Sequence, residues 1–239
     1  MRLIPVIDIL NHVVVRGVAG QRDQYRPIDS ALTSSVEPMA VALAIRERFG
    51  FDELYVADLD AITQGHPATA LYQSLKEAGF RLWIDAGVSN AAAARELADL
   101  DLEQVIVGLE SCPSLGVLRE ILATVPAEQV TFSLDLKNSV PLAGPFWGKS
   151  SRDIVHAVFE AGIRNLIILD LAAVGVGQGV PTVDLCQFAR QVGGTSLSII
   201  TGGGVRHAGD LEQLQQAGVD AVLIASALHT RDSWLMGST

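Results

Sequence analysis

Leu197-Ser-Ile-Ile-Thr-Gly-Gly-Gly-Val-Arg206 and Ala221-Val-Leu-Ile-Ala-Ser-Ala-Leu228 are two short apolar runs, separated by a stretch with helical spacing. Each run is apolar throughout before it ends in small residues, as in parallel strands that are covered on both faces. The same order of strand, turn and helix recurs along the chain, with eight expected strands and eight expected helices in alternation. Strict alternation favours a closed α/β fold, the (β/α)8 TIM barrel, over an open doubly wound sheet.

The other elements have clear sequence signals. Apolar runs predict strands at 3–9, 53–60, 81–86, 104–109, 129–136 and 165–171. Proline or serine starts and glycine stops predict helices at 37–49, 67–78, 113–124 and 150–161. A second β-like run at 12–18 predicts a hairpin after the first strand, and the polar stretch 21–35 is long enough for a lid or binding loop.

The two halves of the chain resemble each other, which indicates a doubled (βα)4 unit. Ile-Pro-Val-Ile-Asp8 in the first half matches Thr-Phe-Ser-Leu-Asp135 in the second. We therefore predict a single barrel domain over 1–239, with an internal twofold repeat of half-barrels at about 1–125 and 126–239.

Small residues after the last two strands predict a phosphate site. Gly202-Gly-Gly204 lets the backbone approach a ligand closely, because no Cβ stands in the way. We expect Ala225 and Ser226 to open the last helix, where free N–H groups and the helix dipole favour an anion. Barrels of this kind commonly hold a phosphate after strands 7 and 8, although two tight turns without a ligand are the simpler interpretation. Including the equivalent turns of the first half, the predicted phosphate-binding residues are Gly87, Gly108, Gly203, Gly204, Ala225 and Ser226.

Composition restricts the possible partners. The formal net charge of −10 argues against nucleic acid and anionic membrane, so local N–H groups have to hold a phosphate. The N-terminus lacks a signal-peptide pattern, and no apolar run approaches the ~20 residues of a membrane span. Cys112 and Cys186 have no metal-ligand spacing, and we expect reduced core thiols in a cytoplasmic protein. No cofactor or metal is expected, although Asp58, Asp60 and Asp85 leave a weakly bound Mg²⁺ open.

Two aspartates at strand ends are the candidate catalytic pair. Asp8 and Asp135 close their strands at the C-terminal end, which is the catalytic face of this fold. Two carboxylates on opposite sides of the barrel opening suit general acid–base catalysis, in which one carboxyl group protonates the substrate while the other abstracts a proton from it. The alternative is a structural role, in which they cap loops or pair with Arg16 and Lys137.

Further side chains are candidate substrate ligands. Trp147 could stack on a planar heterocycle or only pack its loop. The aspartates at strand ends, apart from the catalytic pair, are expected to divide between lining the site and capping turns. Lys137 could form a Schiff base, but an ion pair with Asp135 or plain solvation is the simpler interpretation. The candidates for substrate binding are Arg16, Asp58, Trp147 and Asp170.

Over essentially its whole length, the chain resembles the histidine-biosynthesis barrels, the HisA-type ribotide isomerase and the HisF-type cyclase. The resemblance rests on Ile4-Pro-Val-Ile-Asp8, Val14-Val-Arg16, Val56-Ala-Asp-Leu-Asp60, the Gly87 and Gly202-Gly-Gly turns, Asp135 and Trp147. The isomerase is the nearer type; it converts an aminoaldose bearing a 5-aminoimidazole carboxamide ribotide into its ketose by an Amadori rearrangement, without a cofactor or metal.

The resemblance implies roles for individual residues. Asp8 would move the C2 proton, Asp135 would open the ribose ring, and Trp147 would stack on the imidazole carboxamide. Two phosphates would be held, one by Gly87 with Gly108 and the other by Gly203 with Ser226.

The family pattern is altered around the substrate. Where the family has Thr-Asp-x-x-Arg-Asp-Gly after the sixth strand, this chain has Leu169-Asp-Leu-Ala-Ala-Val-Gly175. Gly-Gly-Gly-Ile-Arg after the third strand becomes Asp85-Ala-Gly-Val-Ser89, and Gly-Arg-Ala-Leu after the last becomes Ala225-Ser-Ala-Leu228. The Asp85 carboxylate adds negative charge near one predicted phosphate.

The sequence thus predicts a HisA-like aldose–ketose isomerase that acts on a phosphorylated aminosugar ribotide by Asp/Asp acid–base catalysis. Two alternatives remain open. One is a paralogue acting on another phosphosugar in a cofactor or one-carbon pathway, with Lys137 as a Schiff-base lysine. The other is a non-catalytic barrel that binds a phosphorylated metabolite or a partner protein.

Overall fold

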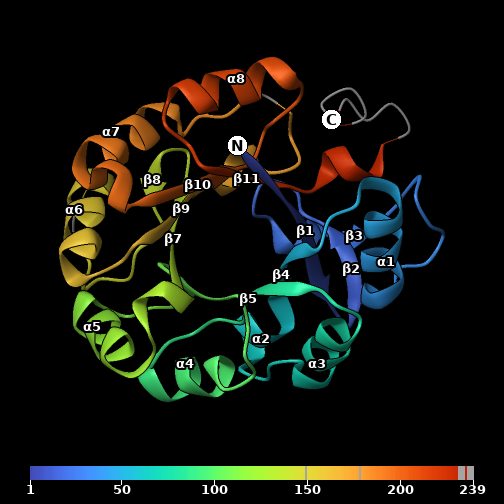
Figure 1. The fold of residues 1–239 in the computed structure, drawn as a ribbon, viewed down its shortest axis with the longest axis horizontal. Helices are drawn as coiled ribbons and strands as arrows, with labels where there is room; N and C mark the ends of the chain where they lie inside the picture. Colours follow the sequence, from blue (N-terminus) through green and yellow to red (C-terminus); the bar gives the residue numbers. More distant parts are fainter. Residues whose placement is uncertain (149, 178, 231–234, 236–239) are drawn as a thin grey trace.

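Eight parallel strands form a closed barrel (Figure 1). A computed structural model describes residues 1–148, 150–177, 179–230 and 235. The barrel strands are β1 (Arg2–Leu10), β4 (Glu53–Asp58), β5 (Arg81–Asp85), β6 (Gln104–Gly108), β7 (Val130–Lys137), β9 (Asn165–Asp170), β10 (Ser198–Gly202) and β11 (Ala221–Ile224). Pairing of β11 with β1, from Ala221 opposite Arg2 to Ile224 opposite Pro5, closes the ring. The predicted (β/α)8 barrel is confirmed.

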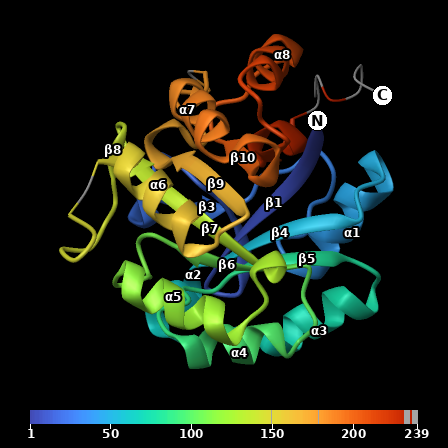
Figure 2. The same ribbon diagram turned by 60° about the vertical axis from the view of Figure 1, so that its left-hand side comes forward.

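Helices surround this barrel in chain order (Figures 1 and 2). They are α1 (Pro38–Phe49), α3 (Thr69–Glu77), α4 (Ala91–Ala98), α5 (Leu115–Thr124), α6 (Ser151–Ala161), α7 (Val183–Gly193) and α8 (Ala208–Gln216). Their ends follow the sequence signals: Pro38 opens α1, and Gly50 ends it at a left-handed φ of 75°. None of the helices that the structure describes is long and apolar enough to cross a membrane.

One strand prediction and one helix prediction need correction. The strand expected to run to Asp60 ends at Asp58, because the Asp58 carboxylate accepts the Ala61 N–H and starts the short helix α2 (Leu59–Gln64). After β11, the described chain forms only the four-residue 3-10 helix η5 (Ser226–His229), where an α-helix was expected.

Alternate residues of each strand point into the barrel or out toward the helices. On β4, Tyr55 and Ala57 belong to the inner apolar cluster, whereas Leu54 and Val56 pack outside it. At the N-terminal end of the strands, Glu53 forms ion pairs with Arg2 and Arg81. This alternation decides which of the strand-end aspartates face the interior.

Hairpins extend two opposite strands of the barrel. β2 (Val13–Arg16) runs antiparallel to β1, as predicted, and β8 (Val140–Pro141) runs antiparallel to β7. β3 (Arg26–Pro27) adds to β2. Each hairpin turns through two left-handed residues, which are Asn11 and His12 in the first and Asn138 and Ser139 in the second.

A carboxylate holds each hairpin turn. Asp60 accepts the N–H groups of Asn11 and His12 at 2.9 and 3.0 Å. Asp170 accepts those of Asn138 and Ser139 at 3.0 and 2.7 Å. The equivalence of the two hairpins agrees with the half-barrel repeat, which itself stays a prediction.

Candidate functional site

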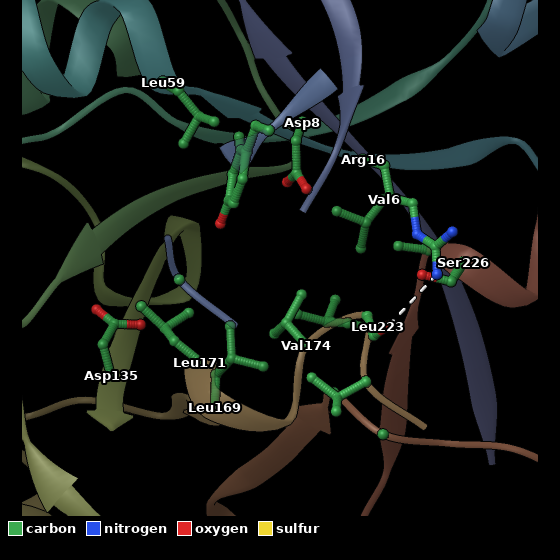
Figure 3. Close-up of a pocket in the computed structure, with 18 of the residues that line it drawn as sticks. Val6, Asp8, Arg16, Leu59, Asp135, Leu169, Leu171, Val174, Leu223 and Ser226 are labelled. Carbon is green, nitrogen blue, oxygen red and sulfur yellow. Dashed lines mark hydrogen bonds between the residues drawn. The ribbon is translucent and has the colours of Figure 1, made fainter. Parts of the chain in front are cut away.

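A cavity of about 1010 Å³ lies at the C-terminal ends of the barrel strands (Figure 3). Its wall comes from the strand ends, from α2 after β4, and from the loops that follow β1, β6, β7, β9, β10 and β11. This volume lies at the upper end of the range that small-molecule sites occupy, about 300–1,000 Å³.

The two predicted catalytic aspartates face each other across this cavity. Going round the ring, β1 and β7 are separated by three strands in either direction. Asp8 and Asp135 reach into the cavity from these opposite sides (Figure 3). The structure therefore brings together the pair that the sequence singled out.

A third carboxylate, that of Asp85 at the end of β5, lines the same cavity. Tyr55 Oη donates to Asp85 Oδ2 at 3.2 Å, and the Gly87 N–H donates to Asp85 Oδ1 at 3.3 Å. Ser133 Oγ donates to Asp135 at 2.7 Å. The Asp8 carboxylate, by contrast, receives no hydrogen bond from any residue that the structure describes.

Burial and mutual repulsion change the acidity of these three groups. Burial, followed by the charge of Asp85, raises the pKa of Asp8 and that of Asp135 from 3.8 to about 7. Burial raises the pKa of Asp85 to about 6, against the lowering effect of the bonds from Gly87 and Tyr55. Near neutral pH, Asp8 and Asp135 can therefore each hold or release a proton.

The long loop after β1 covers part of the cavity, in keeping with the predicted lid or binding loop. Gln21, Arg22, Asp23 and Tyr25 line the wall. Arg22 reaches across to the loop after β6, where it forms an ion pair with Glu110 at 2.8 Å. The loop after β9 meets the same segment, because the Ala19 N–H donates to the Val174 carbonyl at 2.9 Å.

The glycine turn after β10 and the small residues after β11 lie side by side in the cavity wall. All four phosphate ligands predicted there line the cavity: Gly203, Gly204, Ala225 and Ser226. The N–H groups of Gly204 and Ser226 donate to no residue that the structure describes. Arg16 and Arg206 line the cavity as well, although Arg206 is already paired with Asp210 at 2.9 Å. The predicted contribution from a helix dipole was wrong, since η5 is too short to supply one.

Two predicted substrate ligands, Asp58 and Asp170, have structural roles instead. Both side chains are buried, at 1% and 2% exposed, and neither lines the cavity. Each follows an inward-facing residue on its strand, so it points out toward the helix layer. Asp58 accepts the N–H groups of Ala61 and Ala68 and the Tyr72 hydroxyl. Asp170 holds the β7–β8 turn described above.

Trp147 and Gly87 are also placed outside the cavity wall. The Trp147 indole N–H donates to the Cys112 carbonyl at 2.8 Å, and its ring packs 5.5 Å from that of Phe132. At Gly87, a Cβ would lie 2.8 Å from the Ile62 Cα, so this glycine allows α2 to pack closely. Of the first predicted phosphate turn, only Gly108 remains in the wall.

Sequence reasoning missed several of the residues that line the site. Tyr55 could have been found from strand alternation, because it lies three residues before the outward-facing Asp58 on the same strand. Arg22, Glu110 and Arg206 carry no such signal, since they come from loops whose paths depend on tertiary contacts.

Lys137 lies at the cavity edge and makes no ion pair with Asp135 or any other described residue. Within the described part of the chain, no three His, Cys, Asp or Glu side chains are arranged as metal ligands, and Cys112 and Cys186 are buried free thiols.

Comparison with known proteins shows to which family this barrel belongs. A family model described as histidine biosynthesis protein matches residues 2–233. An uncharacterised protein of Methanocaldococcus jannaschii is 33% identical, over 96% of this chain and 93% of its own length. The 1-(5-phosphoribosyl)-5-((5-phosphoribosylamino)methylideneamino)imidazole-4-carboxamide isomerase of Lachnoclostridium phytofermentans is 27% identical, over 100% of this chain and 98% of its own. The isomerase of the same name from Deinococcus radiodurans is 26% identical, over 95% and 93%. The chain belongs to the histidine biosynthesis protein family, the family of the HisA and HisF barrels.

Proposed function

We propose that this protein is an acid–base aldose–ketose isomerase of a phosphorylated aminosugar. The observation that carries the proposal is the pair Asp8 and Asp135, which face each other across the cavity with pKa values raised to about 7. General acid–base catalysis is most efficient when the pKa of the catalytic group lies near the working pH. The isomerase names of the relatives point to the same reaction class.

The two aspartates have complementary roles in this proposal. Asp135 protonates the ring oxygen as the C1–O bond breaks, which leaves an iminium between C1 and the amine nitrogen. Asp8, whose carboxylate no described residue engages, then removes the C2 proton. The resulting enaminol becomes the ketose by proton transfer to C1, so the product is an isomer of the substrate.

Turnover assays on two substrate types test the proposal. Purified protein is incubated with the imidazole carboxamide ribotide, which carries two phosphoribosyl groups, and separately with monophosphorylated aminoaldoses; ketose formation is followed spectroscopically. We expect turnover of one type, with Asp8→Asn and Asp135→Asn each reducing kcat by about 10²–10⁴-fold. The matched control is Asp52→Asn, an exposed carboxyl before β4 at the opposite end of the barrel, which should leave kcat unchanged. Full turnover in either cavity variant would exclude this mechanism.

A further inference from the structure

We propose that Asp85, held in place by Tyr55, is a positioning residue for the catalytic pair. Its fixed negative charge sets the pH range over which Asp135 is protonated while Asp8 is ionised. This inference rests on the proposed function, because it concerns the protonation states that the reaction needs. Asp85 stands where the family pattern has glycine, so the role would belong to this chain rather than to the whole family.

The order and register of the strands place Asp85 between the two catalytic aspartates. One strand, β4, separates β5 from β1, and one strand, β6, separates β5 from β7. Asp8 lies opposite Ala57 on β4, and Ala57 lies opposite Asp85, so the backbones of Asp8 and Asp85 are two strand spacings or about 10 Å apart. All three carboxylates line the same cavity, so the charge of Asp85 acts on both members of the pair through its interior.

Two hydrogen bonds hold the Asp85 carboxylate in one position. The Tyr55 hydroxyl donates to Oδ2 at 3.2 Å, and the Gly87 N–H donates to Oδ1 at 3.3 Å. Tyr55 belongs to the inner apolar cluster and is only 5% exposed, so packing fixes its ring. Burial, followed by the charge of Asp85, raises the pKa of Tyr55 well above its ordinary value, so the hydroxyl keeps its proton and remains a donor. Because both bonds favour the anion, Asp85 ionises before the catalytic pair as the pH rises.

Other charged groups line the cavity, but they act differently on the pair. Arg22, which is paired with Glu110, lowers the pKa of Asp8. Glu110 raises the pKa of Asp135, although less than Asp85 does. Asp85 raises the pKa of both members, and after burial it is the largest cause for each. The remaining titratable or charged side chains in the wall are Arg16, Asp23, Tyr25, Lys137 and Arg206.

Removing the Asp85 charge should make both catalytic carboxyl groups more acidic. A charge about 10 Å away, at an effective dielectric constant of about 20, changes a pKa by about one unit. NMR titration of protein containing ¹³C-labelled aspartate follows the two macroscopic pKa values of the pair, whose signals are identified with Asp8→Asn and Asp135→Asn. We expect Asp85→Asn to lower both values by about one unit. Tyr55→Phe should lower both by a smaller amount, because Asp85 without this donor stays protonated to a higher pH.

Two matched variants separate this effect from a loss of structure. Tyr72→Phe removes a hydroxyl that donates to the buried Asp58 carboxylate outside the cavity, and Asp52→Asn removes an exposed carboxyl. Both should leave the titration of the catalytic pair unchanged. In kinetic assays with whichever substrate type is turned over, Asp85→Asn should move both limbs of the kcat/KM profile to lower pH, so that activity at pH 8 falls by up to about tenfold. A purely structural role would lower kcat without moving the limbs.

Several results would overturn the inference. They are an unchanged titration of the pair in Asp85→Asn, a rise of its pKa values in Tyr55→Phe, and an equal change in Tyr72→Phe. Because the NMR titration needs no turnover, these outcomes are distinguishable from failure of the proposed function. A pair that titrates as expected without turnover of either substrate type would retain the coupling and refute the reaction. Turnover with pH limbs that do not move in Asp85→Asn would retain the reaction and refute the role of Asp85.

Discussion

Replacing Asp85 by Asn should make the protein more stable, and more so at alkaline than at acidic pH. Asp85 lies in the cavity with a pKa raised from 3.8 to about 6. As the pH rises between these values, the unfolded chain releases this proton before the folded protein does. Wild-type stability therefore falls through this window and stays lower above it. Asparagine removes the charge and can still accept the Tyr55 hydroxyl hydrogen bond.

The size of the effect follows from the pKa difference. A difference of about 2 units at about 1.4 kcal/mol each gives an upper limit of about 3 kcal/mol at pH 8. Because Asp85 faces a cavity that solvent enters, we halve this to about 1.5 kcal/mol. At pH 5 the same linkage gives about half as much. For a chain of this length the gain at pH 8 corresponds to about 3–6 °C in Tm.

Thermal and urea unfolding of wild type and Asp85→Asn at pH 5 and pH 8 measure this gain. Asp52→Asn provides the control for replacing an exposed carboxyl. Removal of the Asp85 charge should also lower the pKa values of Asp8 and Asp135, since that charge raises both. A gain that is equal at the two pH values, or larger at pH 5, would refute the reasoning.

Three other experiments test separate parts of the structure. Asp170→Ala should lower the free energy of unfolding by about 2–4 kcal/mol, because three backbone N–H groups lose a charged acceptor. Urea titration measures this change, and a loss below about 1 kcal/mol would contradict the structural role of Asp170. Gly204→Ala should weaken inorganic phosphate binding at least tenfold by calorimetry, because its Cβ would lie 2.0 Å from the Gly179 carbonyl oxygen. The control is Gly50→Ala, because Gly50 has a similar φ and a Cβ added there would meet no atom within 4 Å. This variant should bind phosphate normally. An equal loss of phosphate affinity in both variants would implicate backbone strain alone. Borohydride treatment with substrate should leave no covalent adduct by mass spectrometry; an adduct that disappears in Lys137→Gln would instead support a Schiff-base lyase.

The sequence predicted the barrel because its signals are local. Apolar runs, proline starts and glycine stops each act within a few residues, and they located all eight strands, although β4 ends at Asp58 instead of Asp60. The last helix was a second exception. Small residues at Ala225 and Ser226 allow a turn to begin, but they do not determine whether an α-helix or a 3-10 helix follows.

Strand alternation could have predicted which strand-end aspartates face the cavity, whereas side chains that long-range contacts position could not have been predicted. Asp8 shares the inward face of β1 with Ile4, whereas Asp58 follows the inward-facing Ala57 on β4 and so points outward. Counting in steps of two would have separated these aspartates. No count could have shown that Trp147 turns away from the cavity, because its partner carbonyl belongs to Cys112, which lies 35 residues earlier.

The carboxylate that holds each hairpin turn comes from a later strand unit, and this orders events during synthesis. The turn at Asn11 and His12 obtains its acceptor from Asp60, which is 49 and 48 residues further along the chain. The turn at Asn138 obtains its acceptor from Asp170, which follows 32 residues later. Asp8 and Asp135 thus each lie on a strand whose hairpin turn lacks its acceptor when it leaves the ribosome, and the acceptor of the Asp8 hairpin is synthesised before the Asp135 hairpin has been made.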